Sequence, residues 1–148
     1  IRTVMRFPAA GSLCGVAEPI RDFRDLAAWQ YAMDLAIACA DVWEELPRFE
    51  AFLIEQLRHS SNTVHASIAE GNGRPTTADY LRFLGTASSS LNETRSHLIF
   101  VTRRYPSIMS AQVALELAER TSRPLQGLIK SLREKLHRER KRRQDRGG

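Results

Sequence analysis

The residues best suited to acid–base or metal chemistry are four histidines, at positions 59, 65, 97 and 137. A di-iron site in a helical bundle needs Glu-x-x-His on two helices and two further glutamates. Here Glu93 and His97 are four residues apart rather than three, and the sequence does not carry two copies of the motif. Ser60, His97 and Glu70 have the residue types of a hydrolase catalytic triad, but no nucleophile-elbow motif supports this assignment. We therefore expect no catalytic residue, no metal ion, no cofactor and no enzymatic activity.

A second candidate chemistry is phosphate binding by a basic C-terminal segment. Residues 120–148 contain 11 Lys and Arg against three acidic residues, a balance of +8, whereas residues 1–119 carry −3. Neutralising phosphates requires a high density of Lys and Arg but no special spacing. No aromatic residue follows Tyr105, so we expect no base stacking from this segment. The alternative is a solvated terminus without a specific partner. The candidate nucleic-acid-binding residues are Arg133, Lys135, Arg138, Arg140, Lys141, Arg142 and Arg143.

The third candidate is a glycine-rich turn, Glu70-Gly71-Asn72-Gly73-Arg74. Its glycines would bring backbone N–H groups near a ligand, and Arg74 could hold a phosphate. The turn lacks the preceding strand and the lysine of a phosphate-binding loop, which favours a simple helix end with an ion pair between Glu70 and Arg74. Arg58 could form a second basic surface with the arginines at 82, 95, 103 and 104. We keep Arg74 and Arg58 as further candidates for nucleic-acid contact.

Composition limits the kind of protein that positions these groups. The 148 residues are 43% hydrophobic and 26% charged, which is typical of one globular domain. No apolar run of about 18 residues exists, so we expect no membrane-spanning segment. Cys14 and Cys39 form no disulfide or zinc pattern and fit a cytoplasmic protein. We divide the chain into a flexible leader (1–20), a helical domain (21–137) and a basic C-terminal tail (138–148).

Four segments show the three-and-four-residue apolar repeat of amphipathic helices. Small Ser, Ala and Gly residues in the second and third segments predict close packing between helices. The predicted core stripes, one for each helix, are Leu26, Trp29, Met33, Ala36, Ala40 and Trp43; Phe49, Phe52, Leu53, Leu57, Val64 and Ile68; Tyr80, Leu84, Ala87, Leu91, Thr94, Leu98, Val101 and Tyr105; and Leu117, Thr121, Leu125, Leu128, Leu132 and Leu136.

The connections carry start and stop signals. Gly71 or Gly73 is expected to take the left-handed conformation that ends many helices. Thr76 and Asp79 resemble a capping box, with Asp in place of the usual Glu. Pro124 lies inside the last stripe, where it removes a backbone hydrogen bond at a cost of about 3 kcal/mol, so we expect a kink or a break there. Four long helices with short connections predict an all-α, antiparallel up-and-down four-helix bundle.

Several sequence blocks resemble those of a known family. In chain order they are DFRDLAAWQ (22–30), QLR (56–58), IAEGNGR (68–74), YLRFL (80–84), SLNE (90–93) and GLIKSL (127–132). Their order and spacing are similar to those of the bacterial four-helix-bundle proteins encoded in 23S ribosomal RNA intervening sequences, also called the S23 ribosomal protein family. Distant relatives of that family include the accessory subunit of diversity-generating retroelements, which works with a reverse transcriptase and RNA.

The resemblance implies a ring-shaped homopentamer with a nucleic-acid role and without established catalytic residues. It also suggests a polymerase, such as a reverse transcriptase, as a partner protein. The sequence departs from the family at Ser67, where the family usually has Asn, and this difference would alter a local polar contact. The leader and the basic tail extend beyond the usual family core, so a function of the tail need not be a family function.

We predict a non-enzymatic, oligomeric four-helix-bundle protein that binds RNA or another nucleic acid electrostatically, as an assembly or adaptor factor. The alternative is a protein-interaction ring that docks a partner such as a polymerase and has no direct nucleic-acid role. The two differ in their salt dependence, because salt screens phosphate contacts but does not weaken apolar docking.

Overall fold

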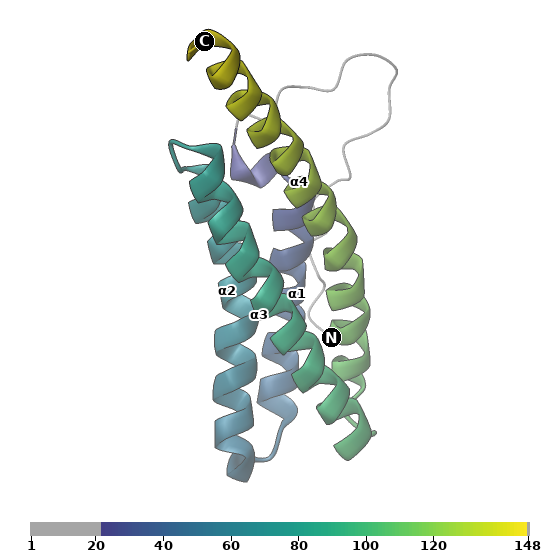
Figure 1. The fold of residues 1–148 in the computed structure, drawn as a ribbon. Helices are drawn as coiled ribbons and strands as arrows, with labels where there is room; N and C mark the ends of the chain where they lie inside the picture. The colour runs from purple at the N-terminus through teal and green to yellow at the C-terminus, as the bar shows by residue number, and fades with distance from the viewer. Residues whose placement is uncertain (1–21, 148) are drawn as a thin grey trace, which may run out of the picture.

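The computed structural model describes residues 22–147, which form an antiparallel bundle of four helices (Figure 1). The helices are α1 (Ala27–Glu45), α2 (Ala51–Asn72), α3 (Thr77–Arg104) and α4 (Met109–Gly147). Each helix packs against its neighbours in the order α1, α2, α3, α4, and α4 closes the bundle against α1. The predicted all-α up-and-down bundle is confirmed. The predicted flexible leader lies outside the described residues. No helix within the described range is long and apolar enough to cross a membrane.

A short, capped 3-10 helix precedes α1. Asp22 caps a short 3-10 helix, Phe23–Asp25, by accepting a hydrogen bond from the Arg24 backbone N–H at 2.8 Å. The Asp25 carboxylate accepts from the Asp22 backbone N–H at 3.2 Å, which completes a capping box. Helix α1 therefore starts one turn further on, at Ala27.

The turn between α2 and α3 differs from the prediction at its glycines. Gly71 lies inside α2, and Gly73 has a φ of −83°, so the predicted left-handed glycine cap is wrong. Gly71 is required for a different reason. A Cβ atom there would lie 2.6 Å from Cδ2 of Tyr80, so only glycine lets α3 approach this closely. The predicted cap of α3 is confirmed, because the Thr76 hydroxyl accepts from the Asp79 backbone N–H at 3.1 Å.

The core stripe of α1 is offset from the predicted one. The side chains that line the core recur with the expected spacing but come mostly from smaller residues, Ala28, Ala32, Leu35, Cys39, Val42 and Leu46. Leu26 and Ala36 of the predicted stripe are buried, but its remaining residues are only half-buried. Two interleaved apolar repeats run along α1, and the prediction chose the bulkier one. The smaller side chains face the core because they let α2 and α4 pack closely.

Helix α1 consequently carries a second apolar stripe. We call it the outer α1 stripe, and it consists of Trp29, Met33, Ile37, Ala40 and Trp43. Ile37 is 49% exposed, and the other four side chains are half-buried. The bundle thus covers this apolar stripe only in part.

The second helix contains the largest error in the predicted core. Phe49 and Phe52 are 78% and 79% exposed, because α2 begins only at Ala51 and its inward face starts with Leu53. The other predicted core residues of α2 are buried: Leu53, Leu57, Val64 and Ile68. The stripe of α3 is confirmed from Leu84 to Val101, and its terminal tyrosines are half-buried.

Small residues bring α2 and α3 together, and this pair makes the most extensive contact in the bundle. The Thr94 hydroxyl lies 3.0 Å from the Ser60 hydroxyl and 2.8 Å from the Ser90 carbonyl oxygen. All three residues are buried. Because buried hydroxyl groups are costly without partners, this small network satisfies the polar groups that close packing encloses.

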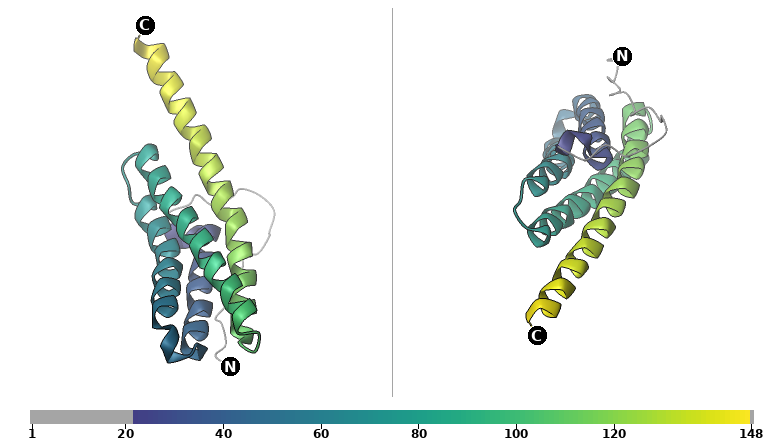
Figure 2. Two further views of the ribbon diagram at one scale, coloured as in Figure 1. Left: turned by 60° about the horizontal axis from the view of Figure 1, so that its bottom comes forward. Right: turned by 90° about the horizontal axis from the view of Figure 1, so that it is seen from above.

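Helix α4 runs through Pro124 without a break, so of the predicted kink or break the break is wrong (Figure 2). Thr121 and Leu125 on either side of the proline are fully buried. Their packing holds the segment helical and offsets the lost backbone hydrogen bond. The predicted α4 residues Leu117, Leu128 and Leu132 pack partly buried against the core, where small residues such as Ala114 and Ala118 occupy the centre.

The buried Cys39 gives the fold a testable pH dependence. Burial raises the pKa of its thiol to about 12, and the hydrogen bond with Ser61 opposes this shift. In the unfolded chain the thiol ionises near its ordinary pKa of 9.0. The stability contribution is thus complete below pH 9 and lost as the pH rises from 9 towards 12.

We expect the free energy of unfolding to fall by about 1 kcal/mol more between pH 8 and pH 10 in the natural protein than in Cys39→Ala. Urea unfolding of both proteins at the two pH values measures this difference. Equal losses in the two proteins would contradict the assignment to Cys39.

Candidate nucleic-acid interface

A cleft of about 400 Å³ lies between the α2–α3 turn and the C-terminal part of α4. Three of the predicted nucleic-acid-binding residues, Arg74, Lys135 and Arg143, line it together. We call this site the turn cleft. It lies at the end of the bundle where α4 projects beyond the other three helices (Figures 1 and 2).

Polar contacts fix the walls of the turn cleft. The Thr77 hydroxyl donates to the Glu139 carboxylate at 3.0 Å and joins the start of α3 to α4. Lys135 Nζ lies 3.9 Å from the same carboxylate, one turn along α4. On the opposite wall, the Tyr80 hydroxyl donates to Asn72 Oδ1 at 3.4 Å. Burial raises the pKa of Tyr80 to about 12, so its hydroxyl stays neutral and can donate a hydrogen bond even at pH 10.

Arg74 is held in place rather than free to move in solvent. Its guanidinium forms an ion pair with Glu70, one helical turn earlier, as the sequence predicted. It also lies over the ring of Phe83, with Cζ 4.3 Å from the ring centroid. Such contacts orient the guanidinium and leave N–H donors for an additional anion.

The charge of the cleft favours an anion. Three cationic groups line it, and Glu139 is the acidic residue among them. Glu139 is already engaged by Thr77 and Lys135. Arg143 makes no ion pair with any residue of the described range. The arrangement can therefore bind a phosphate or a carboxylate through charge-assisted hydrogen bonds.

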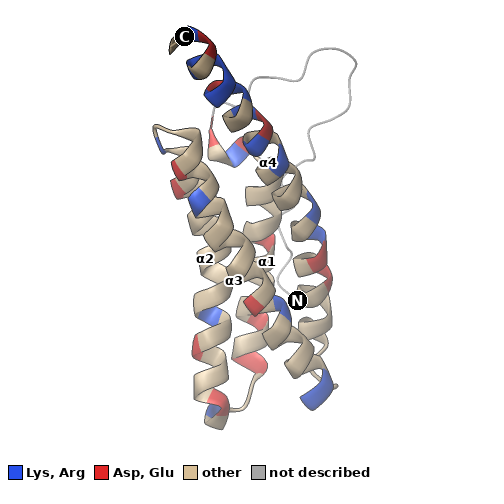
Figure 3. Cartoon of the chain, viewed as in Figure 1, with Lys and Arg blue, Asp and Glu red and all other residues tan. Residues whose placement is uncertain are grey.

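The remaining predicted cations of α4 do not converge on this cleft. Helical geometry distributes them around the projecting part of α4, where all are exposed (Figure 3). They are Arg133, Arg138, Arg140, Lys141 and Arg142. Arg58 lies apart from them in α2, with its Cζ 6.0 Å from the ring centroid of Trp43. The structure thus separates one cluster of three cations from a set of dispersed ones.

Sequence reasoning missed the polar residues of the cleft. Thr77 and Glu139 are 62 positions apart, and Asn72 and Tyr80 belong to different helices. The local sequence pattern around each of these residues is that of an ordinary surface or core position of a helix. Only the unbroken course of α4 through Pro124 places Glu139 beside Thr77.

The histidines and hydroxyls considered for catalysis stay separate. His97 Nε2 lies 3.6 Å from Glu93 Oε1, and residues 22–147 contain no group of three or more potential metal ligands around them. Ser60 is buried in the α2–α3 contact. Glu70 lies ten residues further along the same helix, about 15 Å away. The described residues do not assemble the hypothetical triad.

Fold and site together define a four-helix-bundle protein with a basic cleft beside its last helix. Residues 24–127 match the model of the family described as 23S rRNA-intervening sequence protein, and the chain belongs to this family. No curated protein matches the sequence. The matched region includes Arg58 and Arg74 but ends before Arg133, so the candidate cations of the projecting part of α4 lie outside it.

Proposed function

We propose that this protein is a non-enzymatic, cytoplasmic assembly or adaptor factor that binds RNA or another nucleic acid electrostatically. The observation that carries the proposal is the convergence of Arg74, Lys135 and Arg143 on the turn cleft. One backbone phosphate fits the charge of the cleft, and the exposed cations of α4 would neutralise neighbouring phosphates. Binding of this kind is salt-dependent and largely independent of base sequence.

Self-association would strengthen this binding. The outer α1 stripe supports a homo-oligomer, since it leaves Ile37 49% exposed between two half-buried tryptophans. The family resemblance implies five subunits. Several copies of the turn cleft on one assembly would act together, because each bound phosphate raises the effective concentration of the next cleft.

Neutralising the turn cleft tests the proposal. We expect the triple variant Arg74→Gln, Lys135→Gln, Arg143→Gln to bind a structured RNA probe about 10- to 100-fold more weakly at 50 mM salt. The slope of log affinity against log salt should also fall by about 2 to 3. Fluorescence anisotropy of a labelled RNA hairpin between 50 and 200 mM salt measures both quantities.

The matched control is Arg48→Gln, Arg103→Gln, Arg104→Gln, which removes the same charge at the opposite end of the bundle. This control should retain most of the affinity. Equal losses in the two triple variants would show that net charge alone governs binding, and no loss in either would overturn the proposal.

An exposed apolar group favours the second candidate function, docking of a partner protein such as a polymerase. Large apolar side chains gather at the end of the bundle that carries the α1–α2 and α3–α4 connections. They are Phe49, Phe52, Phe100 and Met109, and each is about half or more exposed. A partner bound there would remain bound at high salt, since apolar contacts are not screened.

A further inference from the structure

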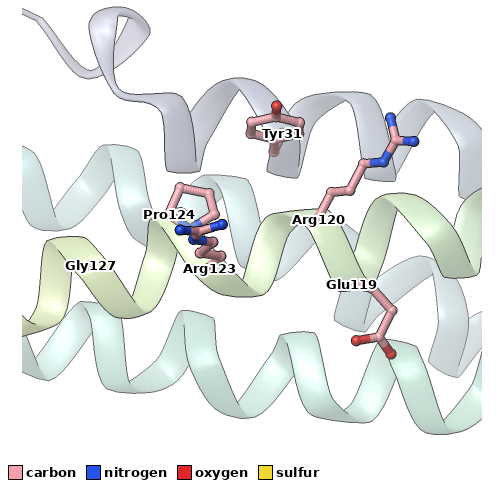
Figure 4. Close-up of a pocket in the computed structure, with 6 residues that line it drawn as sticks. All are labelled: Tyr31, Glu119, Arg120, Arg123, Pro124 and Gly127. Carbon is pink, nitrogen blue, oxygen red and sulfur yellow. The ribbon is translucent and has the colours of Figure 1, made fainter.

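A groove between α1 and α4 forms a second site with a chemistry different from that of the turn cleft. It is open to solvent, has a volume of about 740 Å³ and shares no lining residue with the turn cleft. Tyr31 of α1 lies on one side of the groove and Pro124 and Arg123 of α4 lie on the other, and Arg120 reaches towards α1 (Figure 4). This volume lies within the range of sites that bind small organic ligands.

The groove carries two arginines on α4, Arg120 and Arg123. Neither Arg120 nor Arg123 forms an ion pair with any residue of the described range. Glu119 also lines the groove, but its carboxylate is turned towards α3 (Figure 4). There Arg95 of α3 binds both of its carboxylate oxygens, at 2.8 and 2.9 Å. The bidentate pair between Arg95 and Glu119 therefore engages the acidic residue of the groove lining, so that Glu119 forms no ion pair with Arg120 or Arg123.

The rest of the groove suits a flat ring with a hydrogen-bond donor. Tyr31 is 38% exposed and offers an aromatic face, and Pro124 offers an apolar one. Pro124 has no N–H to donate to the Arg120 carbonyl oxygen, so that oxygen lacks its regular helical partner. Gly127 leaves the floor open, because a Cβ there would meet nothing within 4 Å.

We propose that this groove binds one nucleotide unit, with its phosphate on Arg120 and Arg123 and its base against Tyr31 and Pro124. The unit is either a free nucleotide or one nucleotide of an RNA strand, since both present the same phosphate and ring. The site does not depend on the turn cleft. Base stacking at Tyr31 would add a contact that the basic tail, without aromatic residues, does not supply.

Filling the groove tests this inference without altering its charge. Gly127→Leu places a side chain into the groove, and Gly85→Leu is the matched control on α3, where a Cβ also meets nothing within 4 Å. We expect Gly127→Leu to bind adenosine 5′-monophosphate at least about tenfold more weakly than Gly85→Leu, by isothermal titration calorimetry of the full chain. Arg120→Gln with Arg123→Gln should show a similar loss, and ribose 5-phosphate should bind more weakly than the nucleotide.

A single-stranded ten-nucleotide RNA distinguishes the two sources of the ligand. Loss of RNA affinity in Gly127→Leu but not in Gly85→Leu, without binding of the mononucleotide, assigns the groove to a strand and supports the inference. If neither ligand distinguishes the two leucine variants, the inference is overturned. If only the turn-cleft variant weakens RNA binding, the inference that the groove binds a nucleotide is overturned, and the proposed function is unaffected.

Discussion

Deletion of residues 133–148 is expected to reduce affinity for structured RNA at least about 100-fold at 50 mM salt. The deletion removes eight Lys and Arg and three acidic residues. It takes Lys135, Arg143 and Glu139 from the turn cleft and every cation of α4 from Arg133 onwards. Because each lost phosphate contact lowers the salt dependence as well as the affinity, the salt slope should fall by about 4 or more.

The deletion is informative because it spares the core. The last buried residue of α4 is Ile129, and Leu132, the last apolar residue packed against the core, is retained. The truncated protein should therefore unfold cooperatively at a similar temperature, which circular dichroism checks. Unchanged RNA affinity in a folded truncation would show that RNA binding needs neither the projecting part of α4 nor the turn cleft. Retained binding to a partner protein would then favour the docking function.

Gly71→Ala is expected to destabilise the fold by about 1 to 3 kcal/mol. The new Cβ would lie 2.6 Å from Tyr80 Cδ2 and 3.0 Å from Phe83 Cβ. Phe83 Cβ is fixed to the backbone of α3 and cannot rotate away, so the helices must separate. For a domain of this size we expect the melting temperature to fall by about 3 to 10 °C.

The same substitution at Gly85 is expected to have the opposite effect on stability. A Cβ there meets nothing within 4 Å, and alanine is the better helix former, so Gly85→Ala should stabilise by about 0.5 to 1 kcal/mol. Thermal unfolding of both variants compares one chemical change in two environments. A Gly71→Ala protein that melts at or above the natural protein would show that α2 and α3 are not in such close contact. A loss of RNA affinity in Gly71→Ala is also expected, because Tyr80 lines the turn cleft.

Local signals predicted the helices well, because helix periodicity and caps depend on neighbouring residues. The stripe of α3 and the Thr76 cap are examples. The face of α1 that packs into the core was harder to predict, because two apolar repeats run along this helix. Which repeat is buried depends on the size of the side chains on the neighbouring helices. Phe52 was misplaced because it is adjacent to Leu53, and successive residues of a helix point about 100° apart, so only Leu53 faces the core.

The candidate sites depend on contacts that no local pattern encodes. Arg74 and Lys135 were predicted as cations, but their meeting in one cleft requires α4 to continue through Pro124. The groove between α1 and α4 was not predicted, because Tyr31 and Arg120 are far apart in sequence. The sequence also could not show that Glu119 pairs with Arg95 of α3 rather than with an arginine of the groove.

The two ends of the bundle differ in chemistry, with cations around the turn cleft at one end and exposed phenylalanines at the other. A rotation axis parallel to the helices would repeat this polarity in every subunit without inverting it. A ring built in that way would have one face for polyanions and an opposite face for an apolar protein surface. Both partners could then occupy the ring at the same time, and the thickness of the bundle would set the distance between them.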